Sequence, residues 1–170
     1  MPKSGKSHLE ALIRERFDQV GDEYIDNWAT MRDPRTSAML SFLGDVGGKA
    51  ILDVGCGKGK FAYLLAEHGA ISYGIDLSDL MIRQAKDTKP GLHLAQASAA
   101  ALPFPAEVFD GVICFDTLEH IPDTRQAIAE MTRVVRPSGK ILIIDGSCPN
   151  LVQSDQSRDE RWCNSLEVDA

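Results

Sequence analysis

The spacing of hydrophobic positions changes along the chain. From about residue 7 to residue 46 they recur every three to four residues, which is typical of amphipathic helices. Asp33 and Pro34 form an N-cap followed by proline at the first helical position, and they predict the start of a second helix. Further along, short apolar runs alternate with helical segments. We expect strands at residues 50–54, 71–75, 92–97, 109–115 and 141–144.

Helix and turn signals fill the gaps between these strands. A helix is expected at residues 60–67, and Ser78 and Asp123 are in position to cap two more. The Pro-Ser-Gly sequence at residues 137–139 predicts a turn before the last strand. Continuous apolar strands joined by helices are typical of a parallel sheet covered on both faces. We therefore predict a doubly wound α/β fold, with a mainly parallel sheet of order 3-2-1-4-5 and a ligand crevice beside the first and fourth strands.

The whole pattern fits one domain. A chain of 170 residues is long enough to bury a hydrophobic core. Within it we distinguish an N-terminal helical cap at residues 1–48, a Rossmann-like cofactor-binding core at residues 49–146 and a polar C-terminal tail at residues 147–170.

The segment from Ile51 to Gly59 carries the most chemical information. An apolar strand runs into a turn with glycine at positions 55, 57 and 59, and a helix follows. Such a turn lets the backbone approach a nucleoside-containing cofactor at the end of a parallel strand. Asp53 adds a fixed negative charge, which would repel a pyrophosphate and attract a cation. It favours S-adenosylmethionine, whose sulfonium and amino groups are positive, over NAD, whose fingerprint places the third glycine where Lys60 stands.

Charge and composition narrow the classes of partner. A net charge of -7 without clustered Lys and Arg argues against nucleic acid and anionic membrane surfaces. No stretch reaches the length of an apolar membrane span. The four cysteines follow neither a zinc-binding nor a disulfide spacing, which favours reduced thiols and a cytoplasmic location.

Four patterns follow one another in a diagnostic order. They are Leu-Asp-Val-Gly-Cys-Gly-Lys-Gly at 52–59, Gly-Ile-Asp-Leu-Ser at 74–78, Leu-Pro-Phe at 102–104 with Phe-Asp-Gly-Val-Ile-Cys at 109–114, and Arg-Val-Val-Arg-Pro-Ser-Gly-Lys at 133–140. With these segments the chain resembles the class I S-adenosylmethionine-dependent methyltransferases, over about residues 24–145. It looks most like the small-molecule branch that includes methyltransferases of the ubiquinone and menaquinone biosynthesis type.

The resemblance implies a set of cofactor-binding residues. They are Tyr24, Asp53, Gly55, Cys56, Gly57, Gly59, Asp76, Leu77, Ser98, Ala99 and Asp116. The glycines would line the methionine part, and Asp53 would hold its amino group directly or through water. Asp76 would accept hydrogen bonds from both ribose hydroxyls. Leu77 and Ala99 would lie beside adenine, and Tyr24 would either fold over the cofactor or pack within the helical cap.

Two departures from the resemblance affect the expected site. Ser98 stands where the branch commonly has an aspartate that accepts from the adenine amino group, so a weaker hold on the base is expected. The tail after residue 146 is too short for the usual helix and the antiparallel strands six and seven, whether by truncation or by natural shortening. We therefore expect the fifth strand to be an exposed edge at which chains could associate.

The segment from Asp116 to His120 admits two interpretations. His120 could act as a general base near the acceptor, and Asp116, Glu119 and His120 could together hold a divalent cation. We prefer the alternative that Glu119 and His120 stabilise the turn before Pro122 and that no metal is bound. A base is not obligatory, because the sulfonium is already a strong electrophile and positioning can supply most of the acceleration.

The sequence thus predicts a methyltransferase that moves a methyl group from S-adenosylmethionine to a small-molecule acceptor by in-line displacement. Asp116 and His120 are the candidate catalytic residues. A module that binds S-adenosylmethionine without turnover is the alternative, and an NAD-dependent oxidoreductase is a more distant one. The acceptor atom and the oligomeric state stay open.

Overall fold

A computed structural model describes residues 5–20, 34–145 and 165–169. The strands in these ranges are β1 (Ala50–Val54), β2 (Ile71–Asp76), β3 (His93–Gln96), β4 (Phe109–Phe115), β5 (Val135–Ile144) and β6 (Ser165–Asp169). The helices are α1 (Gly5–Val20), α2 (Pro34–Leu43), α3 (Lys60–Glu67), α4 (Asp79–Thr88), the 3-10 turn η1 (Leu118–His120) and α5 (Thr124–Val134). None of these helices is long and apolar enough to cross a membrane. Tyr24 lies outside the described residues.

The sheet has the predicted arrangement. Strands β3, β2, β1, β4 and β5 lie side by side in this order and pair in parallel, which confirms the doubly wound α/β fold. The predicted caps are also present, since Ser78 accepts from the amide of Met81 and Asp123 from the amide of Gln126.

The prediction that the fifth strand is an exposed edge of the sheet was wrong. Strand β6 pairs antiparallel with β5, so that Ile144 lies opposite Ser165 and Lys140 opposite Asp169. The fifth strand is therefore not the edge of the sheet, and association through that edge is not supported. Leu166 and Val168 alternate with polar residues, a two-residue period typical of a strand, and the polar composition of the tail as a whole hid this short signal.

The predicted turn at residues 137–139 lies inside β5 as a bulge. Val135 pairs with Phe109, but the next pair joins Lys140 to Gly111, so four residues of β5 face one residue of β4. Ser138 takes a φ of 68° in this excursion. The strand thus begins six residues earlier than its apolar run, because β5 pairs with β4 on both sides of the bulge.

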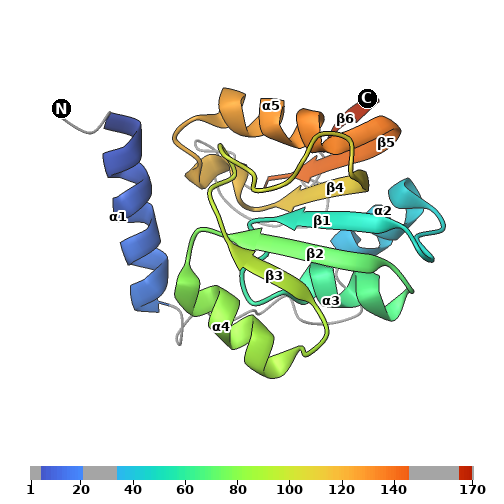
Figure 1. The fold of residues 1–170 in the computed structure, drawn as a ribbon, viewed down its shortest axis with the longest axis horizontal. Coiled ribbons are helices and arrows are strands. Elements are labelled where there is room, and N and C mark those ends of the chain that lie inside the picture. Colours follow the sequence, from blue (N-terminus) through green and yellow to red (C-terminus); the bar gives the residue numbers. More distant parts are fainter. Residues whose placement is uncertain (1–4, 21–33, 146–164, 170) are drawn as a thin grey trace, which may run out of the picture.

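Helices cover both faces of the sheet. Successive strand residues point to opposite faces. Leu52 therefore packs with Met131 of α5 on one face, while Ile51 packs with Met39 of α2 and Leu65 of α3 on the other. Figure 1 shows α1 apart from these layers, standing beside the carboxyl ends of the strands, toward which the arrows point. This is the end of a parallel sheet at which ligands bind.

Candidate functional site

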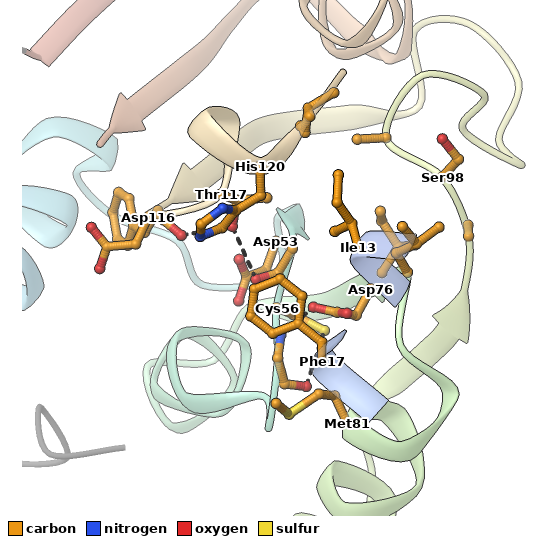
Figure 2. Close-up of a pocket in the computed structure, with 18 of the residues that line it drawn as sticks. Ile13, Phe17, Asp53, Cys56, Asp76, Met81, Ser98, Asp116, Thr117 and His120 are labelled. Atoms are coloured by element: carbon orange, nitrogen blue, oxygen red, sulfur yellow. Dashed lines mark hydrogen bonds between the residues drawn. The ribbon is translucent and has the colours of Figure 1, made fainter. Parts of the chain in front are cut away.

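A cavity lies at the carboxyl ends of β1, β2 and β4, beneath α1 (Figure 2). It brings together most of the residues that the sequence singles out, namely Asp53, Gly55, Cys56, Gly57, Asp76, Leu77, Ser98, Ala99, Asp116 and His120. Gly59 is not among the lining residues. It has a φ of 76° and directly precedes α3, and a Cβ there would come within 3.3 Å of the Cβ of Ala85. Glycine is therefore needed at this position for the turn to lead into the helix.

Two glycines of the turn differ in what surrounds them. Gly55 has a φ of 75°, and a Cβ built on it would overlap the side chain of Thr117. Gly57 has a φ of 51°, and a Cβ there would meet no atom of the described residues within 4 Å. Gly55 is therefore required by packing between β1 and β4. Gly57 instead borders open space, into which a ligand can come close to the backbone.

Asp53 is the most enclosed charged group of the site. It is 2% exposed, and its Oδ2 accepts a hydrogen bond from the amide of Ala62 at 3.2 Å. Burial, reinforced by the nearby charge of Asp76, raises its pKa to about 7 although the bond from Ala62 lowers it. The fixed negative charge expected from the sequence is thus only partly present at neutral pH without a ligand. A cation placed beside Asp53 would lower its pKa and favour the fully ionised carboxylate.

Asp76 closes the other side of the glycine turn. Its Oδ2 accepts from the amide of Gly57 and its Oδ1 from the amide of Ser78, each at 2.8 Å. Burial raises the pKa of this carboxyl above its usual value, while the two amides act in the opposite direction. Each carboxylate oxygen has a second lone-pair direction, so Asp76 can still accept two further hydrogen bonds.

Cys56, between these two acids, is buried at 8% exposure. Burial, followed by the charges of Asp53 and Asp76, raises its thiol pKa well above the ordinary value. Cys56 is therefore an uncharged part of the cavity wall rather than a nucleophile.

Arg35 is a site residue that the sequence reasoning missed. It is 6% exposed, lies in the cavity wall and pairs with the carboxylate of Asp116. Its guanidinium carbon also lies 5.4 Å from the centre of the Phe61 ring, a cation–π contact. Asp116 has a φ of 48° at the end of β4. The only signal in the sequence is that Arg35 directly follows Asp33 and Pro34, which fixes where its helix begins.

His120 reaches the cavity next to α1. Its ring packs edge-on against Phe17, with 5.2 Å between ring centres, and its Nε2 lies 3.4 Å from a carboxylate oxygen of Glu119. Asp116 is already paired with Arg35. Across the described ranges, no group of three or more His, Cys, Asp or Glu side chains is arranged to hold a metal ion. The absence of a metal nevertheless stays a prediction.

Helix α1 covers the cavity, and we call it the covering helix. Glu10, Ile13 and Phe17 line the cavity from one face of it, and Figure 2 shows the last two beside Asp76 and Cys56. These positions are three and four residues apart, the spacing at which helical side chains share a face. The covering helix is held by polar contacts at its two ends and near its middle, which are Lys6 with Asp123, Glu10 with Ser98, and Asp18 with Ser78.

Comparison with known proteins identifies the class that this fold and cavity define. Residues 52–143, more than half of the chain, match the family of methyltransferase domains. The chain belongs to this family. The predictions of a class I methyltransferase domain and of S-adenosylmethionine as its cofactor are thereby confirmed.

Named relatives agree with this membership. The malonyl-(acyl-carrier protein) O-methyltransferase of Salmonella typhimurium is 32% identical over 88% of this chain and 60% of that protein. The ubiquinone biosynthesis O-methyltransferase of Coxiella burnetii is 36% identical over 55% of this chain and 42% of its own length. Among solved structures, an S-adenosylmethionine dependent methyltransferase from Mesorhizobium loti has a TM-score of 0.60 at 29% identity, over 68% of this chain and 53% of that one. The chain thus spans 60% or less of these proteins.

Proposed function

We propose that this protein transfers a methyl group from S-adenosylmethionine to an oxygen atom of a small-molecule acceptor. The observation that carries the proposal is the pair of carboxylates, buried Asp53 and half-buried Asp76, in the wall of the cavity that opens at Gly57. When bound, the cofactor supplies a methyl group made electrophilic by its sulfonium. Oxygen is proposed as the acceptor because the similar proteins from Salmonella and Coxiella are named O-methyltransferases.

The two acids have different tasks in this proposal. Asp76 accepts hydrogen bonds from the two ribose hydroxyls, because each of its oxygens keeps one lone pair after binding the amides of Gly57 and Ser78. Asp53 accepts from the amino group of the methionine part and becomes fully ionised in doing so. The uncharged wall at Leu77 and Ala99 packs against the base.

Arg35 and Asp116 form the opposite, methyl-transfer end of the cavity. Arg35 supplies the positive charge that the carboxylate of the methionine part needs, and Asp116 holds its guanidinium in place. His120 faces the acceptor and can take its hydroxyl proton, with Phe17 fixing one face of the imidazole. Most of the acceleration then comes from holding the acceptor oxygen in line with the sulfonium.

Turnover tests the proposal directly. The purified chain is incubated with S-adenosylmethionine and a panel of phenols, catechols and carboxylic acids, and release of S-adenosylhomocysteine is measured. We expect release that depends on one oxygen acceptor class. Binding of S-adenosylhomocysteine by calorimetry with no release across the panel would favour the module without turnover. Binding of NAD in its place would favour the oxidoreductase.

A further inference from the structure

Glu10 of the covering helix occupies the end of the cavity at which the sequence leaves adenine without an acidic partner. Its Oε1 accepts a hydrogen bond of 2.6 Å from the hydroxyl of Ser98, across 88 positions of the chain. Both residues line the cavity, together with Ala97 and Ala99. In Figure 2, Ser98 lies across the cavity from Asp116, at the far end from the proposed site of methyl transfer.

We propose that Glu10 supplies the carboxylate that accepts a hydrogen bond from the 6-amino group of adenine. The assignment rests on the proposed function, since it requires S-adenosylmethionine in this cavity. Ser98 is then a positioning residue: its hydroxyl donates to Glu10 and holds the carboxylate at the base. A hydroxyl suits this position better than a second acid, because two carboxylates at 2.6 Å would repel each other.

The other acids of the cavity wall lie away from Ser98 and have other partners. The wall contains Glu10, Asp53, Asp76 and Asp116 as its acidic residues. Asp53 and Asp76 lie at the glycine turn, and Asp116 pairs with Arg35 at the opposite end. Glu10 is thus the one carboxylate that lies at Ser98 among the described residues of the wall. The hydrogen bond from Ser98 uses one lone pair of Oε1. A carboxylate offers about four, so Glu10 can accept further hydrogen bonds.

The hydrogen bond between Ser78 and Asp18 fixes the position of Glu10 relative to the base. Asp18 accepts from the hydroxyl of Ser78 at 2.5 Å, at the N-cap of α4. Glu10 lies eight residues earlier, about 12 Å along a helix that rises 1.5 Å per residue. Ile13 and Phe17, which lie between Glu10 and Asp18 in the helix, also line the cavity. The helix therefore presents an acid to the base and apolar side chains to the rest of the ligand.

Two ligands that differ at positions 6 and 1 of the purine provide the test. S-adenosylhomocysteine carries an amino group at C6 and an unprotonated N1, whereas S-inosylhomocysteine carries a carbonyl oxygen at C6, which a carboxylate facing that position repels, and a hydrogen on N1. Dissociation constants are measured by calorimetry for the wild-type chain and for Glu10→Ala. We expect Glu10→Ala to weaken S-adenosylhomocysteine about tenfold and to leave S-inosylhomocysteine unchanged or bound more tightly.

The ratio of the two dissociation constants separates recognition from mere docking of the helix. If Glu10 only anchors α1, its loss will weaken both ligands equally, and this result would overturn the proposal. Glu15→Ala is the matched control, because Glu15 is an exposed acid of the same helix outside the cavity wall. It should leave both constants unchanged, and a loss of selectivity in this variant would also count against Glu10.

A rescue variant adds a second, independent readout. Glu10→Ala combined with Ser98→Asp returns a carboxylate to the same end of the cavity and should restore the preference for the adenine ligand. Failure to restore it would mean that this end does not face the amino group. If the wild-type chain bound neither ligand, the cofactor site itself would be refuted, a result that differs from any change confined to the Glu10 variants.

Discussion

The two sides of the cavity are built in different ways. Of the strand-end acids, Asp53 is buried and Asp76 is half-buried, and their hydrogen bonds come from backbone amides within 20 residues of chain. The covering helix contains no buried residue, and side-chain contacts across 60 to 117 positions hold it. Segments with few buried apolar contacts open most easily. We therefore expect the strand ends to decide whether the cofactor binds and the covering helix to adjust how tightly.

The largest effect is expected at Asp76. Asp76→Asn removes the negative charge that two ribose hydroxyls would share, and charge-assisted hydrogen bonds are about twice as strong as neutral ones. We expect the dissociation constant of S-adenosylhomocysteine, measured by calorimetry, to rise about a hundredfold.

His120→Ala provides the comparison for Asp76. His120 contacts Phe17 and Glu119 rather than the glycine turn, so its loss should change cofactor binding less than about threefold. A larger loss of binding in His120→Ala than in Asp76→Asn would mean that the cofactor site is misplaced.

The two glycines of the turn allow stability and binding to be separated. Gly55→Ala would place a Cβ against Thr117 at a φ of 75°, and we expect a loss of about 2–4 kcal/mol in the free energy of unfolding. Gly57→Ala meets open space, so only the left-handed backbone opposes it, at about 1–2 kcal/mol. Its methyl group should instead weaken S-adenosylhomocysteine about tenfold.

Urea unfolding and calorimetry on both glycine variants check this division. The variants form a matched pair, since each adds one methyl group to the same turn at a positive φ. Similar losses of stability in both, with unchanged ligand binding in Gly57→Ala, would show that the space at Gly57 is not used by the cofactor.

The pKa of Asp53 predicts that binding weakens in acid. Only the ionised carboxylate attracts the amino group, and with a pKa of about 7 it is mostly protonated at pH 6 and mostly ionised at pH 8. The dissociation constant should therefore fall about tenfold between pH 6 and pH 8. Asp53→Asn should bind weakly at both pH values and lose the slope, whereas a slope that persists in this variant would belong to another group.

Stability of the unliganded chain should change in the opposite direction. Burial raises the pKa of Asp53 from 3.8 to about 7, so between these values the folded state holds a proton that the unfolded state has lost. The contribution of Asp53 to the free energy of unfolding is complete below pH 4 and is lost as the pH rises through 7, by about 4 kcal/mol at most. The stability of Asp53→Asn relative to wild type should therefore increase over this pH range.

Residues on strands could be predicted from the sequence because local patterns fix them. The run from Ile51 to Val54 and the glycines after it define both a strand and the place of Asp53 at its end. Asp76 follows in the same way from the end of β2. Parallel pairing then brings the two acids together without any long-range information beyond strand order.

Residues on the N-terminal helices could not be placed in this way. The helical period predicts that Glu10 and Arg35 lie on helices, but it does not say which helix face meets the cavity. Contacts with Ser98 and Asp116, more than 80 positions away, decide that. Strand β6 was missed for a related reason, since its two apolar residues stand in a polar tail and only pairing with β5 makes this segment a strand.

The smallest effect is expected where the covering helix is most exposed. Lys6 pairs with Asp123, but its side chain is 63% exposed, and exposed ion pairs contribute little because solvent screens them. Lys6→Met should therefore change the dissociation constant of S-adenosylhomocysteine less than about twofold, against the tenfold loss expected for Glu10→Ala on the same helix. Titrations of both variants at 50 mM and 500 mM salt would sharpen the contrast, because salt should erase what little Lys6 contributes. If Lys6→Met weakened binding as much as Glu10→Ala, the helix would act only through its attachment to the rest of the domain, and Glu10 would have no separate role in binding the ligand.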